Sequence, residues 1–75
     1  MIKDAVGKRI RELRTAKCLS QEKFAELCGL DRTYITSLEN GKRNIAIVNL
    51  EKICNALNIT LKDFFDFKYW CMNMR

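Results

Sequence analysis

Few side chains in this chain of 75 residues are of the types that perform covalent or metal chemistry. It has four cysteines and no histidine. The cysteines are Cys18, Cys28, Cys54 and Cys71. Because they form no Cys-x-x-Cys pair, no metal site and no cofactor are expected. Without histidine the chain lacks the commonest group that activates a serine or cysteine nucleophile, so an enzyme is the least favoured class of protein.

The polar residues with the most informative spacing lie on a predicted helix over about 32–40. Ile35 and Leu38 face inward, and four polar side chains share the outer face. These four are Arg32, Thr33, Thr36 and Ser37. Arginine can donate two hydrogen bonds to guanine O6 and N7, and a threonine methyl suits the methyl group of thymine. We interpret this face as one that contacts base edges in the major groove of double-stranded DNA.

A second set of residues is placed to contact the DNA backbone rather than the bases. Tyr34 lies at the lip of the predicted helix, where its ring either packs on sugar and phosphate or lies near a dimer axis. Four further residues lie at the end of this helix and in the basic loop after it: Asn40, Lys42, Arg43 and Asn44. Contacts to phosphate carry affinity and register but no sequence information, so these residues are expected to hold the helix in place.

The overall charge agrees with a nucleic-acid partner. Lys and Arg number 14 against 9 Asp and Glu, which gives a net charge of +5 and a pI of about 9.2. Ten of the 14 basic residues and six of the nine acidic ones precede residue 44. This balance favours nucleic acid over a membrane and places the binding half in the first 43 residues. One domain of this size encloses no deep pocket, and no small-molecule ligand is expected.

The elements that position these side chains are predicted to be helices. Apolar residues recur at helical spacing, with no strand-like alternation. Helices are expected over about 2–17, from Ser20 to Gly29, over 32–40, over 46–57 and from Thr60 onward. In the fourth, Ile47 is expected to face inward with Leu50 and Ile53. The fold class is therefore all-α, a compact domain of five helices.

Residues 21–40, with the sequence QEKFAELCGLDRTYITSLEN, predict a helix-turn-helix. Ser20 is an N-cap residue for the first helix of the pair, and Asp31 for the second. Ala25 is small where the two helices cross, and Gly29 permits the reversal of the chain. All these positions fit the motif together, which favours it over a generic helical hairpin.

From about residue 5 to residue 66 the sequence resembles the lambda-Cro/repressor type of helix-turn-helix domain. The resemblance implies that Gln21 bonds a DNA phosphate, and that Arg14 and Glu39 form a structural ion pair. The strings LDRTYI, KRN and DFF look most like the controller proteins of restriction–modification systems. Such proteins bind operator DNA as dimers. We therefore expect this chain to bind a pseudo-palindromic operator as a homodimer in the bacterial cytoplasm, to block or recruit RNA polymerase, and to regulate its own synthesis.

The C-terminal end is the expected homodimer contact. We divide the chain into a DNA-binding domain at 1–66 and an aromatic tail at 67–75. Five of the seven aromatic residues lie in this region: Phe64, Phe65, Phe67, Tyr69 and Trp70. A core this small cannot easily bury them all, and exposed apolar surface marks a partner site. The alternative is a tail that folds back as a lid on its own core.

The sequence is also compatible with three other functions. One is an antitoxin-like or other protein-interaction module, in which the aromatic tail binds a partner protein. A second is a phage or mobile-element repressor with the same helix-turn-helix. A third is an RNA-binding helical domain, although the predicted DNA-facing helix carries only Tyr34 for stacking on unpaired bases.

Overall fold

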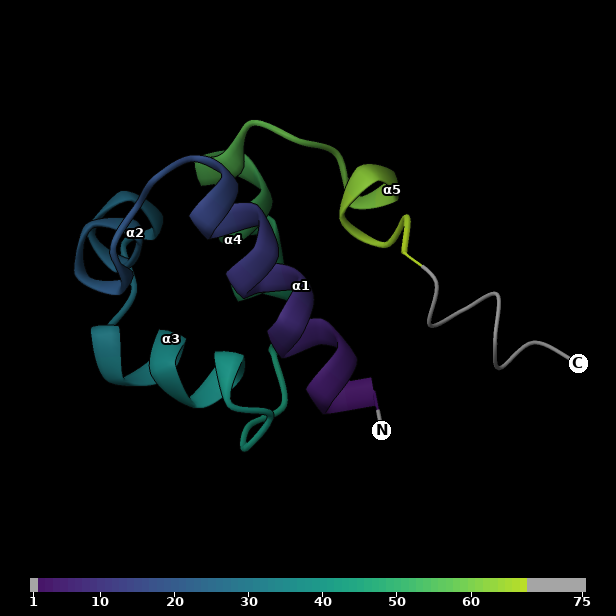
Figure 1. Cartoon of the computed structure of the whole chain (residues 1–75), viewed down its shortest axis with the longest axis horizontal. Helices are drawn as coiled ribbons and strands as arrows, with labels where there is room; N and C mark the ends of the chain where they lie inside the picture. The colour runs from purple at the N-terminus through teal and green to yellow at the C-terminus, as the bar shows by residue number, and fades with distance from the viewer. Residues whose placement is uncertain (1, 68–75) are drawn as a thin grey trace, which may run out of the picture.

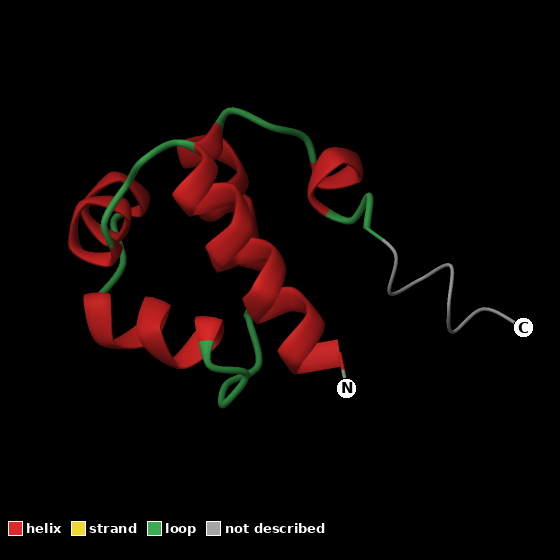
Figure 2. Ribbon diagram, viewed as in Figure 1, coloured by secondary structure: helices red, strands yellow, loops and turns green. Residues whose placement is uncertain are grey.

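The computed structural model describes residues 2–67, which form five α-helices joined by short loops (Figure 1, Figure 2). The helices are α1 (Ile2–Ala16), α2 (Gln21–Cys28), α3 (Arg32–Glu39), α4 (Ile47–Leu57) and α5 (Leu61–Phe64). The described range contains no strand, and the prediction of an all-α, five-helix domain is confirmed. In Figure 1, α1 crosses the centre of the view, with α2 and α3 to one side and α5 to the other.

The core is built from one apolar stripe of each helix. α1 packs against α3, α2 against both α3 and α4, and α4 against α5. The largest fully buried side chains are Phe24, Phe64, Ile10, Ile35, Leu38, Ile53 and Leu57. Because α3 is held from one side by α1 and from the other by α2, its outer face keeps a fixed orientation.

Local hydrogen bonds fix the turn between α2 and α3. Ser20 Oγ accepts a bond from the amide of Lys23 at 3.0 Å and so caps the start of α2. Gly29 ends α2 in the left-handed region, with φ at 71°, a conformation that costs a glycine little. Asp31 occupies the N-cap position of α3, but its side chain makes no capping hydrogen bond.

Gly7 lets α1 approach the end of α3. A Cβ atom at this position would overlap the carbonyl oxygen of Leu38 and crowd that of Glu39. The sequence pattern indicated only that Gly7 lies within a helix. The structure shows that the absence of a side chain brings α1 into direct contact with α3 near the C-terminus of α3.

The expectation that Ile47 faces inward is wrong. Its side chain is 70% exposed, and that of the adjacent Val48 is 59% exposed. Leu50 and Ile53 are buried as expected. Ile47 is the first residue of α4 and lies almost one turn before Leu50, past the edge of the core. The helical period was correct, but the core ends before the helix does.

α5 is a single turn fixed at both ends. Thr60 Oγ1 accepts a hydrogen bond from the amide of Asp63 at 3.1 Å. At the other end, Arg9 of α1 donates to the carbonyl oxygens of Asp63 and Phe64 at 2.7 and 2.8 Å. The Arg9 guanidinium also lies 5.8 Å from the ring centre of Phe67. One arginine therefore ties the end of the described chain to the first helix.

The three cysteines of the described range are free thiols. Cys28 and Cys54 are buried free thiols, and Cys18 is exposed. Burial raises the pKa of the Cys28 thiol to about 11, so this group stays protonated at neutral pH. Among residues 2–67, no group of three or more potential metal ligands comes together. No helix in the same range has the length and apolar character needed to cross a membrane.

Candidate nucleic-acid interface

The outer side of α3 carries the residues predicted to contact bases. We call this surface the reading face; it consists of Arg32, Thr33, Thr36 and Ser37. Arg32 and Thr33 are exposed, whereas Thr36 and Ser37 are half-buried. On the opposite side, Ile35 and Leu38 have essentially no exposed surface. The structure therefore brings all four predicted residues together on one face of a firmly anchored helix.

Gln21, the first residue of α2, is joined to the reading face by hydrogen bonds. Its Nε2 donates to Glu39 Oε1 at 3.0 Å, and its Oε1 accepts from Thr36 Oγ1 at 3.0 Å. Thr36 Oγ1 also lies 3.0 Å from the carbonyl oxygen of Arg32, one turn earlier in α3. Side chains expected to contact phosphate and bases separately are thus linked to each other.

Arg14 and Glu39 form a buried ion pair with two contacts. Arg14 Nε lies 2.7 Å from Glu39 Oε2, and Arg14 Nη2 lies 3.0 Å from Glu39 Oε1. A third nitrogen, Nη1, donates to the carbonyl oxygen of Leu19 at 2.7 Å. Each of the two charged residues is only 8% exposed. Since both charges are paired and hydrogen-bonded, the pair locks α1 to the end of α3.

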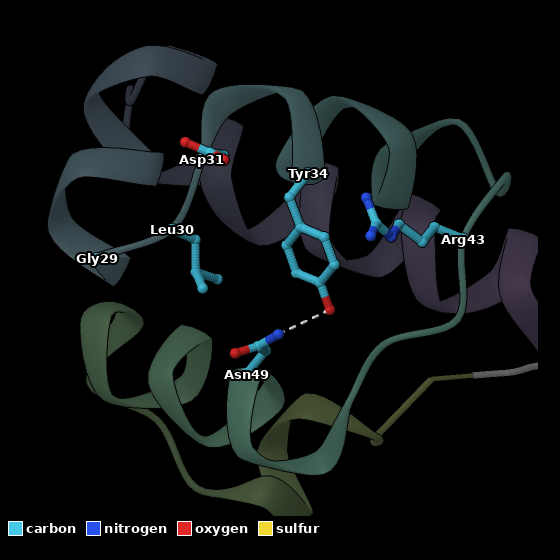
Figure 3. Close-up of a pocket in the computed structure, with 6 residues that line it drawn as sticks. All are labelled: Gly29, Leu30, Asp31, Tyr34, Arg43 and Asn49. Carbon is cyan, nitrogen blue, oxygen red and sulfur yellow. Dashed lines mark hydrogen bonds between the residues drawn. The ribbon is translucent and has the colours of Figure 1, made fainter.

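Tyr34 lines a groove between α3 and α4, where its hydroxyl points toward Asn49 (Figure 3). The groove has a volume of about 570 Å³. The Tyr34 hydroxyl accepts bonds from Asn49 Nδ2 at 3.0 Å and from the amide of Ala46 at 3.3 Å. Arg43 lies beside the ring in Figure 3, with its guanidinium carbon 4.8 Å from the ring centre. Tyr34 therefore connects the recognition helix to the start of α4.

The loop after α3 places its polar side chains next to the reading face. Asn40, Lys42, Arg43 and Asn44 are all exposed. The amide of Lys42 donates to the carbonyl oxygen of Ser37 at 3.0 Å, which holds the loop against α3. Gly41 has φ at 70° and lies against Asp4 of α1, so the chain turns sharply there. The stacking of Arg43 on Tyr34 keeps this charge at the edge of the helix.

The residues predicted to form the dimer contact fall into three groups. Phe64 is 0% exposed in its own core, so it offers no surface to a second copy, and that assignment is corrected. Phe65 and Phe67 are half-buried and stack with ring centres 6.3 Å apart. Tyr69 and Trp70 lie outside the described residues.

Exposed apolar side chains on α4 and α5 were missed as candidates for that contact. Ile47 and Val48 begin α4, and Leu61 on α5 is 45% exposed. The apolar spacing of α4 included Ile47, but it predicted that this residue is buried in the core. We call these three residues, with Phe65 and Phe67, the apolar end.

Two polar residues with structural roles were also missed. Arg9, which the sequence analysis did not single out, donates to the carbonyl oxygens at the end of α5. Asn49 bonds Tyr34 and had no distinguishing neighbour in sequence. A polar residue within the apolar pattern of α4 is the only signal that could have marked Asn49.

Comparison with known proteins agrees with this geometry. Residues 10–64 match the helix-turn-helix family HTH_3. The control protein C.MunI of a Mycoplasma species is 54% identical over 65 residues, covering 85% of this chain and 88% of C.MunI. The restriction–modification controller protein C.AhdI from Aeromonas hydrophila superimposes with a TM-score of 0.81 at 49% identity, covering 84% of this chain and 91% of that one.

A complex with DNA is among the similar structures. The controller protein C.Esp1396I, solved as a tetramer with its natural 35 base-pair operator, gives a TM-score of 0.82 at 35% identity. The match covers 88% of this chain and 87% of that one. The chain therefore belongs to the helix-turn-helix family of the lambda-Cro/repressor type and, within it, to the controller proteins of restriction–modification systems.

Proposed function

We propose that this chain is a transcriptional regulator that binds a pseudo-palindromic operator as a homodimer. The observation that carries the proposal is the reading face: four polar side chains on the outside of a helix whose inner side is fixed in the core. The operator complex of the related C.Esp1396I supports this assignment. Such a role requires no catalytic step, and it places the protein on DNA in the bacterial cytoplasm.

Direct recognition of bases is assigned to the reading face. Arg32 is exposed at the start of α3, the end of a recognition helix that enters the major groove. Its planar guanidinium matches the O6 and N7 acceptors of guanine. Thr33, also exposed, offers a hydroxyl and a methyl group. Ser37 and Thr36 lie one turn further along, where the helix reaches the next bases or the backbone.

Contacts to phosphate are assigned to groups that retain a free donor in the structure. Gln21 uses one hydrogen of its amide on Glu39, which leaves the other for a phosphate oxygen. The Tyr34 hydroxyl accepts two bonds and so keeps its own hydrogen to donate. The exposed loop residues complete this set: Asn40, Lys42, Arg43 and Asn44. Together they hold α3 in register on the duplex.

Dimerisation is assigned to the apolar end. Ile47 and Val48 expose apolar surface at the start of α4, and α4 packs against α5. A few base contacts from one protomer give little discrimination, and a symmetric dimer doubles them. Its half-sites are expected about 34–36 Å apart, one turn of DNA. Operator occupancy would then rise steeply with protein concentration, because DNA binding is coupled to dimerisation. The bound dimer would either block or recruit RNA polymerase.

The test is selection of random duplex DNA by the purified protein, followed by sequencing of the retained fraction. We expect a recovered palindrome whose half-sites are spaced by about one helical turn. Retention of DNA with no enriched sequence would overturn the proposal of a specific operator. A single unrepeated half-site would leave DNA recognition standing and overturn the dimer.

A further inference from the structure

The fold determines the hydrogen-bonding direction of one hydroxyl on the reading face, that of Thr36. Thr36 Oγ1 lies 3.0 Å from Gln21 Oε1 and 3.0 Å from the carbonyl oxygen of Arg32. Both neighbours are oxygens without hydrogens, so they can only accept. A threonine hydroxyl has one hydrogen, and here either bond consumes it.

The orientation of the Gln21 amide is not arbitrary, because a carboxylate fixes it. Glu39 is paired with Arg14 through two contacts, at 2.7 and 3.0 Å, and the carboxylate of such an ion pair can only accept hydrogen bonds. The Gln21 group that faces Glu39 Oε1 at 3.0 Å must therefore be the NH₂ end. The carbonyl end is then turned toward Thr36, which obliges Thr36 to donate.

Thr36 consequently presents only lone pairs and a methyl group to a partner outside the protein. Thr33 provides the contrast on the same helix. It is exposed, and no side-chain hydrogen bond involves its hydroxyl within residues 2–67. A free hydroxyl rotates and can either donate or accept, so Thr33 tolerates both kinds of base edge.

We propose that Thr36 is a specificity-determining residue that accepts a hydrogen bond from an exocyclic amino group in the major groove. The inference rests on the proposed function, since it requires the reading face to meet base edges. Adenine N6 and cytosine N4 are the amino donors there, whereas guanine O6 and thymine O4 are acceptors. At the base facing it, Thr36 selects A or C and disfavours G or T.

Discrimination arises because guanine O6 or thymine O4 would face the Thr36 oxygen, and both atoms would then be hydrogen-bond acceptors. Rotating the hydroxyl toward the DNA would relieve that clash only by giving up the hydrogen bond that it donates to Gln21 Oε1 or to the carbonyl oxygen of Arg32. Glu39 is therefore a positioning residue for this contact: it touches no base, but through Gln21 it determines which way the Thr36 hydroxyl points. The buried ion pair behind α3 thus acts on recognition as well as on stability.

The experiment compares Thr36→Val with Thr33→Val as a matched control. Valine keeps the shape and one methyl of threonine but has no hydroxyl. Selection of random duplexes is carried out with the wild type and both variants. We expect Thr36→Val to lose the preference for A or C in one column of each half-site. Thr33→Val should leave that column unchanged.

A second measurement removes the amino group from the DNA instead. In the selected operator, the adenine or cytosine of that column is replaced by purine or 2-pyrimidinone, which lack the exocyclic amine. We expect wild-type affinity to fall about 2- to 10-fold, the range for one neutral hydrogen bond. The affinity of Thr36→Val should not fall further, since the two changes remove the same contact.

The outcomes separate this proposal from the proposed function. A change in a column that prefers G or T, or equal losses for wild type and Thr36→Val on the modified DNA, would overturn the role of Thr36 alone. Absence of any enriched sequence with the wild type would overturn operator binding itself. Thr36→Ser, which restores a hydroxyl, should recover the preference for an amino base and so excludes a loss caused by altered packing.

Discussion

The surface proposed to bind DNA and the surface proposed to bind a second copy are built in opposite ways. On the reading face, polar side chains are connected to the core by directional bonds, from Arg14 through Glu39 and Gln21 to Thr36. At the apolar end, Ile47 and Val48 project from the start of α4 with most of their surface exposed. Hydrogen bonds fix angle and polarity, whereas apolar contact is proportional to area and indifferent to direction.

The difference explains how a chain of 75 residues can be both selective and adjustable. Discrimination between bases needs side chains of fixed orientation, and in the proposed function the hydrogen bonds from Arg14 through Glu39 and Gln21 to Thr36 provide it. Self-association needs only sufficient apolar area, so its strength can be tuned by the size of a few side chains. Changes at each surface should therefore affect different measurable quantities, and the following predictions are ordered from the largest effect to the smallest.

Glu39→Ala should have the largest effect, because it leaves the Arg14 guanidinium buried without its partner. We expect the free energy of unfolding to fall by about 3–5 kcal/mol, measured by urea denaturation. Glu51→Ala, at an exposed glutamate of α4, is the control and should change it by less than about 0.5 kcal/mol. A small loss for Glu39→Ala would show that water reaches Arg14.

The double variant Arg14→Leu with Glu39→Leu separates the cost of an unpaired charge from the value of the pair. Removing both charges leaves no uncompensated group, so we expect much of the lost stability to return. Specific DNA binding should not return with it, because Gln21 then lacks the acceptor that orients its amide. Recovery of both properties would show that the ion pair has no part in recognition.

Ile47→Asp tests whether the apolar end forms the dimer contact. A carboxylate in the dimer contact would be desolvated without a partner, and we expect association to weaken by at least about 2 kcal/mol, roughly 30-fold. Sedimentation equilibrium measures this constant. Leu27→Asp, at a leucine of α2 that is 52% exposed, is the matched control and should leave it unchanged. Equal weakening by both variants would move the contact away from α4.

Sequence reasoning performed well where local signals determine the outcome. The starts of all five helices and the ends of the first four follow from the apolar period and from caps such as Ser20 and Gly29, each of which acts over a few residues. The Arg14–Glu39 pair and the grouping of polar residues on α3 came from resemblance and from helical spacing. These features depend on one element or on a recurrent motif, so they could be predicted.

What sequence reasoning missed depends on contacts between distant elements. Whether Ile47 is buried is decided by where the core ends, and this boundary has no local signal. The same holds for Arg9, which meets α5 more than fifty residues later, and for Gly7, whose role depends on the carbonyl groups of α3. Phe64 was assigned to the dimer contact by its aromatic neighbours, although the core needed it.

Arg32→Ala tests the reading face without touching its support. Because Arg32 is exposed, its removal should leave the stability unchanged while specific binding weakens by about 1–3 kcal/mol. Fluorescence anisotropy on operator and random duplexes measures both affinities. The preference for guanine at one position of the half-site should relax. Equal loss on the two kinds of DNA would place Arg32 on phosphate and not on a base.

Lys42→Ala should have the smallest and least specific effect. Lys42 is exposed in the loop after α3, and its amide, which holds the loop to Ser37, is unaffected by the substitution. A lysine on phosphate releases counterions on binding, so its loss should lower the slope of log affinity against log salt by about 1. Operator and random DNA should weaken alike, in a salt titration with Lys52→Ala as the control on α4. A loss confined to the operator would mean that Lys42 contacts a base. Sequence recognition would then not be limited to α3 but would include the loop that follows it.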